Sequence, residues 1–249
     1  MQRAGRPGLS AARALGDRRA VPDPRWIARL TGRSAEEVGR WLGEMDRYTE
    51  MEGRIRRTHR DGGRSSYAQF RAPLELYALV RALQPELVVE AGVSSGVSSA
   101  HFLLALRANG HGRLVSIDLP TRQRGPRLAP DESPVALPPG RPTGWAVPPE
   151  LHDGWELRLG PSQRELPKVA RQGEPIGIFL HDDLHTPSHL TWELRTVEPF
   201  LVPGAVVLAD NTAWTGAAFP RFAARHGVPY VRRRGSDLVG LRMPAPRKE

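Results

Sequence analysis

The sequence predicts an α/β protein with a doubly wound, mostly parallel sheet of seven strands and a helical cap at the N-terminus. From residue 86 onward, short β-branched and aliphatic runs alternate with amphipathic helical segments. The residues before them show helix start signals and apolar residues on one helical face. We therefore expect a tail and helical cap over residues 1–72 and an α/β domain over residues 73–249.

The expected cap consists of a tail, two helices and a connection. Residues 1–20 have low apolar content, which predicts a frayed tail or loose helix. A proline directly after Asp23 indicates the first turn of a short helix. Ser34 and Glu37 have the spacing of a capping box that opens a longer helix. Residues 50–63 are predicted to be a basic, flexible connection.

Strands and helices then alternate to the C-terminus. Strands are expected at residues 86–91, 113–118, 155–159, 176–181 and 205–210, and residues 230–233 and 238–242 close the sheet as a hairpin-like pair. One helix starts at Pro73, and others are expected at residues 98–108, 162–171, 188–197 and 215–226.

Residues 119–154 depart from a compact β–α unit because they contain nine prolines. A loop of this length is usually functional or disordered, and proline stiffens it. The segment leaves the carboxyl end of a strand, which places it on the ligand side of an open α/β sheet. We interpret it as a lid over the site; an inert insertion is the alternative.

The composition limits the location and partners of the protein. The absence of cysteine excludes disulfides, thiolate metal sites and a cysteine nucleophile. No apolar stretch approaches the ~20 residues of a membrane span, and no signal peptide is visible, so a cytoplasmic protein is expected. The net charge of +9 comes almost entirely from arginine, which we attribute to GC-rich coding bias. We expect no specific nucleic-acid partner and no membrane partner, and we leave a homodimer open.

A glycine turn joins the first strand of the α/β region to its helix. The strand ends at Glu90, and the turn contains Gly92 and Gly96. Such a turn brings a ligand close to bare backbone at a helix N-terminus. The spacing differs from the dinucleotide fingerprint, and no Walker lysine follows. Asp118 ends the next strand about 20 residues later, where a carboxylate can accept hydrogen bonds from a ribose diol. A plain packing turn is the alternative interpretation.

These four residues together resemble motif I and the following strand end of class I S-adenosylmethionine (SAM) dependent methyltransferases. The resemblance covers about residues 73–243 and implies a seven-stranded sheet with an antiparallel last strand. It also implies that SAM is the cofactor. The expected cofactor-binding residues are Glu90, Gly92, Ser94, Gly96, Asp118, Ser162 and Asp182.

Polar residues follow two further predicted strands. Asp182 and His185 lie after the strand at 176–181, and Asp210 and Asn211 end the next one. These strand ends are neighbours at the carboxyl edge of a doubly wound sheet. The pattern resembles O-methyltransferases of the catechol and caffeoyl-CoA type, in which such residues bind a divalent metal. The resemblance implies that Asp182, Asp210 and Asn211 hold Mg²⁺ or another divalent cation.

The alignment of the first strand end is open. His181 could align with the metal-binding aspartate of the catechol type. A closer resemblance is to a branch in which the strand ends in His-Asp-x-x-His-Thr, and there Asp182 and His185 are the paired site residues. Members of this branch often accompany sugar and macrolide O-methyltransferases in natural-product pathways. Capping and turn formation are the structural alternatives for these residues.

We therefore expect a SAM-dependent methyltransferase that acts on a hydroxyl of a small molecule of natural-product or sugar type. His185 is the candidate base, and Asp182 orients it or holds the metal. Three alternatives stay open: a nucleic-acid methyltransferase, a SAM-fold enzyme that performs hydroxylation or cyclisation, and a non-catalytic SAM-binding protein. The first lacks support because no Asn/Asp-Pro-Pro-Tyr/Phe motif is present.

Overall fold

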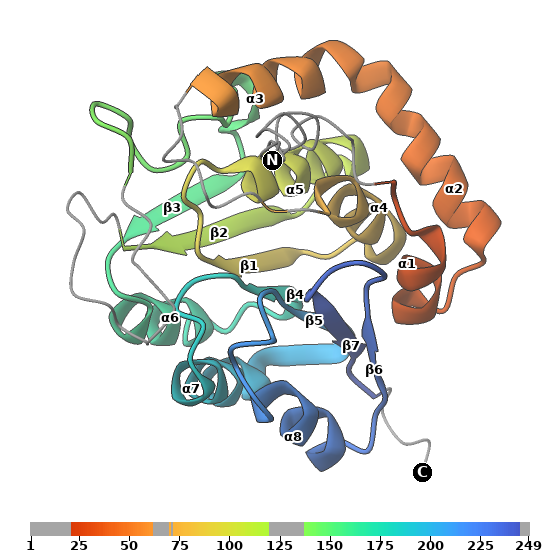
Figure 1. Ribbon diagram of the computed structural model, residues 1–249, viewed down its shortest axis with the longest axis vertical. Coiled ribbons are helices and arrows are strands. Elements are labelled where there is room, and N and C mark those ends of the chain that lie inside the picture. The colour runs from red at the N-terminus through yellow and green to blue at the C-terminus, as the bar shows by residue number, and fades with distance from the viewer. Residues whose placement is uncertain (1–20, 62–69, 71, 120–136, 245–249) are drawn as a thin grey trace, which may run out of the picture.

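The computed structural model describes residues 21–61, 70, 72–119 and 137–244. Within this part of the chain, helices cover both faces of a seven-stranded sheet (Figure 1). The predicted fold class is confirmed. The predicted tail at residues 1–20 and residues 120–136 of the predicted lid lie outside the described residues.

Five strands of the sheet run parallel and two close it. The parallel strands are β1 (Leu87–Ala91), β2 (Arg113–Asp118), β3 (Trp155–Leu159), β4 (Ile176–His181) and β5 (Leu201–Ala209). Strand β7 (Val239–Arg242) pairs antiparallel with both β5 and β6 (Tyr230–Arg232). The order is β3-β2-β1-β4-β5-β7-β6. It reverses between β1 and β4, and open α/β sheets bind ligands at such a switch point.

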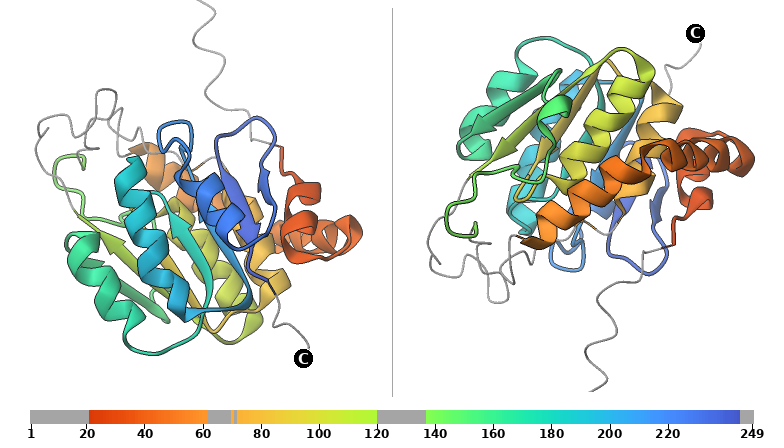
Figure 2. Two further views of the ribbon diagram at one scale, coloured as in Figure 1. Left: turned by 90° about the horizontal axis from the view of Figure 1, so that it is seen from below. Right: turned by 90° about the horizontal axis from the view of Figure 1, so that it is seen from above.

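The helices form a layer on each face of the sheet (Figure 2). Helices α4 (Pro73–Leu83) and α5 (Val97–Asn109) cover one face. The other face is covered by α6 (Ser162–Ala170), α7 (Pro187–Val197) and α8 (Ala218–Arg225). All five residues of strand β1 are buried, as the apolar run Leu87–Val89 at its start predicts. Among the described helices, none has the length and apolar character needed to cross a membrane.

The predicted caps start the N-terminal helices. Helix α1 (Pro24–Thr31) begins where Asp23 accepts a hydrogen bond from the backbone of Trp26. Helix α2 (Ala35–Glu44) begins at a complete capping box between Ser34 and Glu37. A 3₁₀ turn, Met45–Tyr48, then leads into α3 (Thr49–Asp61). Apolar side chains of α1 and α2 belong to the same core cluster as those of α4 and α5. The division at residue 72 therefore stays a prediction.

The expected flexible connection over residues 50–63 is wrong for residues 50–61, which belong to α3. Figure 1 shows α3 lying along the outer side of α5. The buried face of α3 consists of Glu52, Ile55 and His59. Two of these three side chains are polar, so the segment lacks the apolar stripe by which a packed helix is recognised. Tertiary contacts rather than an apolar period select the helix here.

A buried ion pair connects the cap to the far edge of the sheet. Arg233, next to β6, donates from Nε to Oε1 of Glu75 in α4 at 2.6 Å, and their side chains are 5% and 1% exposed. The same carboxylate oxygen accepts the backbone N–H of Asp23 at 3.1 Å. Arg233 also donates to the carbonyl of Val21 at 3.2 Å. One carboxylate thereby joins α4, the start of α1 and the β6–β7 hairpin.

Replacement of Glu75 by Gln is expected to lower the free energy of unfolding by about 3–5 kcal/mol, because Arg233 stays buried without a counter-charge. Asp237→Asn is the matched control. This variant breaks the ion pair between Arg232 and Asp237 on the same hairpin, in which the side chains are 51% and 52% exposed. Because the pair is exposed, the free energy of unfolding is expected to fall by less than about 1 kcal/mol. Urea denaturation followed by circular dichroism measures both variants, and equal losses would contradict the structural role of Glu75.

Candidate functional site

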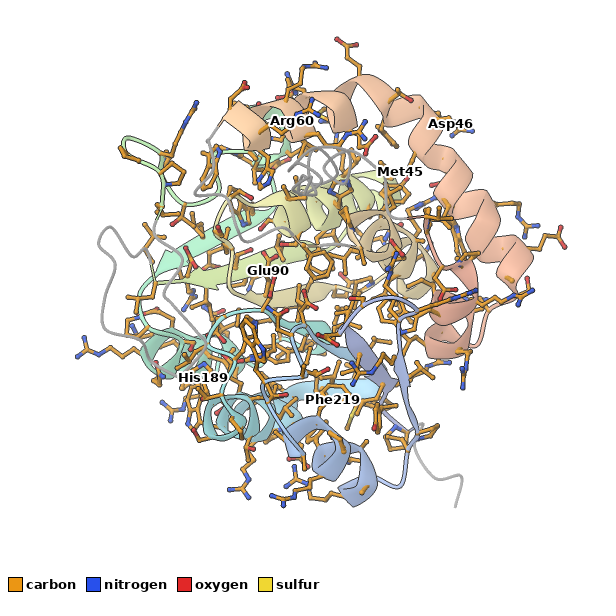
Figure 3. All side chains as sticks on the ribbon, in the orientation of Figure 1. Met45, Asp46, Arg60, Glu90, His189 and Phe219 are labelled. Atoms are coloured by element: carbon orange, nitrogen blue, oxygen red, sulfur yellow. The ribbon has the colours of Figure 1, made fainter. Side chains whose placement is uncertain are left out.

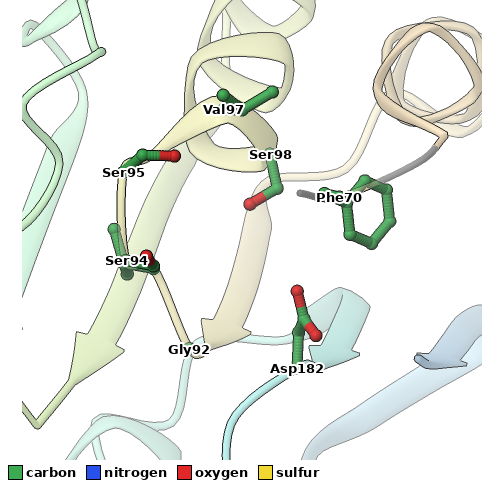
Figure 4. Close-up of a pocket in the computed structure, with 8 residues that line it drawn as sticks. Phe70, Gly92, Ser94, Ser95, Val97, Ser98 and Asp182 are labelled. Carbon is green, nitrogen blue, oxygen red and sulfur yellow. The ribbon is translucent and has the colours of Figure 1, made fainter. Parts of the chain in front are cut away.

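A pocket lies at the switch point of the sheet, between the loop after β1 and the loop after β4 (Figure 4). Its lining residues are Phe70, Gly92, Val93, Ser94, Ser95, Val97, Ser98 and Asp182. The backbone N–H of Asp182 donates to the carbonyl of Ala91 at 2.8 Å, which extends the β1–β4 pairing past the end of the strands. The carboxylate of Asp182 points toward the start of α5. The predicted glycine turn and the loop between β4 and α7, residues 182–186, which we call the second polar loop, therefore meet in one pocket.

The close approach of the two loops requires glycine at position 92. Gly92 has a φ of +91°, and a Cβ atom there would lie 2.0 Å from the carbonyl oxygen of Asp182. Gly96 has a φ of +85°, and its Cβ would lie 2.9 Å from the Cα of Gly144. A side chain at either position would collide with backbone, which cannot rotate away as a flexible side chain can. Steric contacts thus explain why both of these positions require glycine.

Helix α5 begins directly at the pocket. Gly96 occupies its N-cap position, and no side chain caps the helix there. The first amide groups of a helix lack partners within the helix and attract negatively charged groups. Val97 and Ser98 of this first turn line the pocket. The start of α5 is therefore suited to a carboxylate of a bound ligand.

Glu90 lies beneath the turn in the middle of the sheet (Figure 3) and is fully buried. Its carboxylate accepts hydrogen bonds from the hydroxyl groups of Ser98, Ser99 and Ser116, the last two at 2.6 Å. Burial raises the pKa of Glu90 to about 7, although the three hydroxyl groups act to lower it. Glu90 thereby joins β1 to β2 and α5. Its direct contact with the cofactor stays a prediction.

Asp118 lies at the carboxyl end of β2, as the sequence predicted. Its carboxylate accepts the backbone N–H of Val93 at 3.3 Å and the hydroxyl of Thr143 at 2.9 Å. Burial raises the pKa of Asp118, and these hydrogen bonds oppose the rise. An ionised carboxylate offers about four acceptor positions, so it can still accept hydrogen bonds from a diol.

The described part of the proline-rich insertion, residues 137–154, packs against the glycine turn. Gly144 donates its backbone N–H to the carbonyl of Ser94 at 2.8 Å, and Ala146 donates to that of Ser95 at 2.8 Å. These contacts place the insertion beside the pocket. Its action as a lid stays a prediction.

His59 of α3 reaches the same turn from the cap. Its Nδ1 atom lies 2.9 Å from the hydroxyl oxygen of Ser95, and its ring stacks on Trp145 of the insertion with 6.4 Å between centroids. Burial lowers the pKa of His59, with a further contribution from Arg60. The cap, the glycine turn and the insertion therefore meet at one histidine. No sequence pattern marks His59, because its segment lacks the apolar stripe of a packed helix and resembles a basic connection.

The loops that follow β4 and β5 bring together the four side chains expected to carry the chemistry, namely Asp182, His185, Asp210 and Asn211. Asp182 Oδ1 lies 3.4 Å from Nε2 of His185, and Nδ2 of Asn211 lies 3.5 Å from the same nitrogen. Burial and the charge of Asp182 raise the pKa of Asp210 to about 6. The backbone N–H of Asp210 donates to the carbonyl of His181 at 3.0 Å, which places the two strand ends side by side.

A second cluster lies on the other side of β4 and was not predicted from the sequence. It contains His181, Asp183, His189 and Glu193, and the last two lie one turn apart on α7. Burial lowers the pKa of both histidines, but Asp183 and Glu193 outweigh it and raise both to about 10. Ser162 donates to Asp183 at 3.0 Å in this cluster and is not among the residues that line the pocket. Its predicted cofactor contact stays a prediction.

The pocket fits the groups that SAM presents. SAM carries a carboxylate, an ammonium group and a ribose diol. The start of α5 and the carboxylate of Asp182 line the pocket, and Asp118 lies next to it, bonded to the backbone of Val93; these groups match the three groups of SAM. Gly92 lets the backbone of Asp182 approach the turn, which sets the position of the Asp182 carboxylate in the pocket.

Comparison with known proteins agrees with this geometry. The sequence family described as a methyltransferase domain matches residues 89–212. A comparison with curated protein sequences found no match.

Among solved structures, the chain resembles a putative O-methyltransferase from Klebsiella pneumoniae, with 15% identity, a TM-score of 0.55 and coverage of 83% of this chain and 98% of that one. It also resembles the O-methyltransferase TomG from Streptomyces achromogenes in complex with SAM, with 20% identity, a TM-score of 0.54 and coverage of 82% and 98%. An O-methyltransferase from Bacillus cereus matches with 12% identity, a TM-score of 0.51 and coverage of 82% and 99%.

The strand order, the glycine turn and the family match define the class of protein. The chain belongs to the class I SAM-dependent methyltransferases.

Gly92→Ala is expected to weaken binding of S-adenosylhomocysteine by at least about 100-fold, because the added Cβ pushes the β1 and β4 loops apart. Gly110→Ala is the control. Gly110 has a similar φ of +78°, yet nothing lies within 4 Å of its Cβ position, so only a backbone cost of about 1 kcal/mol is expected there. Isothermal titration calorimetry measures the affinities. Equal affinities for both variants would refute the steric requirement.

Glu90→Gln is expected to change the pH dependence of stability. The pKa of Glu90 is about 7 in the folded protein against an ordinary 4.5, so the folded state binds more protons between these values. The ionisation of Glu90 should therefore cost the parent roughly 3 kcal/mol of stability as pH rises from 4.5 to 8, and only this contribution should be absent from the variant.

Urea denaturation of the ligand-free proteins across this pH range gives the difference between variant and parent. Glu86→Gln provides the control, since the side chain of Glu86 is 71% exposed and its variant should follow the parent. A difference between Glu90→Gln and the parent that does not grow with pH would show that Glu90 is not held protonated.

Proposed function

We propose that the protein transfers a methyl group from SAM to a hydroxyl group of a small molecule. The observation that supports this proposal is the position of Asp182. Its carboxylate lines the pocket beside Gly92 and also lies 3.4 Å from His185 in the second polar loop. A methyl donor in the pocket and a base in the loop are thereby adjacent. The solved structures named as O-methyltransferases share this fold.

The transfer needs a positioned acceptor and a route for its proton. SAM supplies an electrophilic methyl group when bound. The acceptor oxygen forms the new C–O bond, the S–C bond breaks, and S-adenosylhomocysteine leaves with the bonding electron pair on sulfur. The hydroxyl proton must pass to a base as this happens. We assign this role to His185, whose Nε2 lies near both Asp182 and Asn211.

The residues around His185 fit a hard divalent cation. Asp182, Asp210 and Asn211 offer carboxylate and amide oxygens, which Mg²⁺ prefers. Asp182 raises the pKa of Asp210, so the two carboxylates lie close enough to repel each other, and a bound cation would relieve that repulsion. When bound, Mg²⁺ would lower the pKa of the acceptor hydroxyl. These three residues are our proposed metal ligands.

The proposed acceptor is a ring-bearing small molecule of natural-product or sugar type. Trp214 is 48% exposed, and its ring centroid lies 5.9 Å from that of His185. An exposed indole next to the proposed base offers a flat apolar surface on which the ring of an acceptor can stack. Two of the similar solved structures are named for tomaymycin synthesis and for calicheamicin methylation.

The test uses the purified protein, SAM and a panel of catechols, macrolactones and sugar nucleotides, with S-adenosylhomocysteine formation as readout. Asp210→Asn is expected to weaken Mg²⁺ binding and to lower kcat by about 10–100-fold, with S-adenosylhomocysteine affinity changed by less than about 3-fold. His185→Ala is expected to lower kcat by about 10²–10⁴-fold and to recover part of the rate at high pH, where hydroxide replaces the base.

Two exposed residues provide the matched controls. Asp153→Asn and His111→Ala change an exposed aspartate and an exposed histidine outside the site and should behave like the parent. Full activity in the presence of a chelator would refute the metal, and full activity of His185→Ala would refute the base. Products that carry no added methyl group would refute methyl transfer itself.

A further inference from the structure

The glycine turn between β1 and α5 has a backbone that does not support itself. Gly92, Ser94 and Gly96 have positive φ values of +91°, +48° and +85°. Ser94 is not a glycine, and a left-handed backbone is disfavoured at such a residue unless its surroundings hold it there. The same turn lines the pocket from Gly92 to Ser95. The shape of the pocket therefore depends on the contacts that hold this turn.

The middle of the turn is held by the insertion and by the cap. Gly144 and Ala146 of the insertion donate backbone N–H groups to the carbonyls of Ser94 and Ser95, both at 2.8 Å. Helix α3 of the cap contributes His59, whose Nδ1 atom lies 2.9 Å from the hydroxyl oxygen of Ser95. Of these contacts, that of His59 is the one to a side chain of the turn.

His59 is fixed in its orientation. It lies on the buried face of α3 with Glu52 and Ile55, and it is 4% exposed. Its ring is nearly parallel to that of Trp145, with 8° between the two planes. A buried ring nitrogen costs free energy unless it has a hydrogen-bond partner, and Ser95 is this partner for Nδ1. The stack thus sets the plane of the ring, and the hydrogen bond sets where Nδ1 points.

His59 can act on a bound ligand through Ser95. Ser95 is one of the residues that line the pocket (Figure 4), whereas His59 is not among them. A serine hydroxyl offers one hydrogen to donate and two lone pairs to accept. The contact with His59 uses one of these positions and restrains the rotation of the hydroxyl group. The positions that are left on the same oxygen are then fixed in direction next to the pocket.

We propose that His59 is a positioning residue for the cofactor, which holds the hydroxyl of Ser95 and thereby keeps the glycine turn in its ligand-binding form. This inference rests on the part of the proposed function that places SAM in the pocket. It gives α3 a second role besides covering α5. Because His59 acts through Ser95 and not on the reacting atoms, its loss should raise the KM for SAM far more than it lowers kcat.

Two substitutions of His59 separate the hydrogen bond from the stack, with the affinity for S-adenosylhomocysteine measured by isothermal titration calorimetry. Burial and Arg60 lower the pKa of His59, so the ring is neutral near pH 7 and the hydrogen bond joins neutral groups. His59→Phe keeps a flat ring against Trp145 but cannot bond to Ser95, so the affinity should fall by about 10-fold. His59→Asn places an amide where Nδ1 lies and should restore the affinity to within about 3-fold of the parent.

His152→Phe is the matched control. His152 is exposed, and its ring lies beside that of Trp155 with 5.3 Å between centroids. The same exchange of rings beside a tryptophan should leave the affinity within about 2-fold of the parent, as for other surface substitutions. An equal loss of affinity in His152→Phe and His59→Phe would overturn the proposal.

A double-mutant cycle tests whether His59 acts through Ser95. Ser95→Ala alone should lower the affinity by about 10-fold. Adding His59→Phe to it should lower the affinity by less than about 2-fold more, because the partner is already gone. A residue that only supports the fold would instead exert its full effect in both backgrounds. Additive losses, or parent affinity in folded His59→Phe protein, would overturn the proposal.

Hydrogen exchange of the parent protein covers the case in which His59→Phe fails to fold. S-adenosylhomocysteine should slow the exchange of residues 92–98 and also that of residues 55–61 of α3, because a ligand that orders the turn also orders the helix bonded to it. In Ser95→Ala the effect on the turn should remain and the effect on α3 should disappear. Equal protection of α3 in both proteins, or none in the parent, would overturn the proposal.

These measurements need neither an acceptor nor a metal, so they are separate from the test of methyl transfer. A parent protein that shows the expected coupling between His59 and Ser95 but methylates no acceptor would refute the proposed function and support this inference. Methyl transfer by the parent, with an unchanged KM for SAM in His59→Phe, would refute this inference alone.

Discussion

The contact between Gly92 and the backbone of Asp182 is the constraint on which the site depends. A carbonyl oxygen occupies the space that a Cβ atom would need at position 92. This contact brings the loops after β1 and β4 together at the point where the strand order reverses. It also places the carboxylate of Asp182 in the pocket and, on the same short loop, His185 next to it. The pocket and the proposed base thus share one backbone junction.

The features that depend on local pattern could be predicted from the sequence. Strand β1 begins with the apolar run Leu87–Val89, and it leads into a turn where steric contacts require glycine at positions 92 and 96. The carboxyl ends of parallel strands meet at one edge of the sheet, so the sequence predicts that Asp182 and Asp210 lie close together. The antiparallel closure by the last two strands follows from the family resemblance. Strand β5 begins earlier than expected, at Leu201, despite the proline and glycine that follow.

The features that depend on which face a side chain takes could not be predicted. Strand β4 is buried on both faces, so its apolar run does not tell which side His181 occupies. The pleat sends His181 toward α7 and leaves Asp182 facing the pocket. Adjacent residues therefore belong to two different clusters. The polar helix α3 was missed for a related reason, since His59 gains its place through contacts with Ser95 and Trp145 rather than from an apolar period.

The insertion holds the glycine turn through main-chain atoms. Gly144 and Ala146 each donate a backbone N–H to a backbone carbonyl of the turn. Such hydrogen bonds do not depend on the side chains of the residues that form them, because every residue except proline has a backbone N–H. Apart from the few side chains that pack against the turn, the side chains of the insertion are consequently not needed to support it. A lineage of such enzymes can thus exchange those side chains while the hydrogen bonds to the turn stay the same, so that sequence change in the insertion and preservation of the turn need not compete.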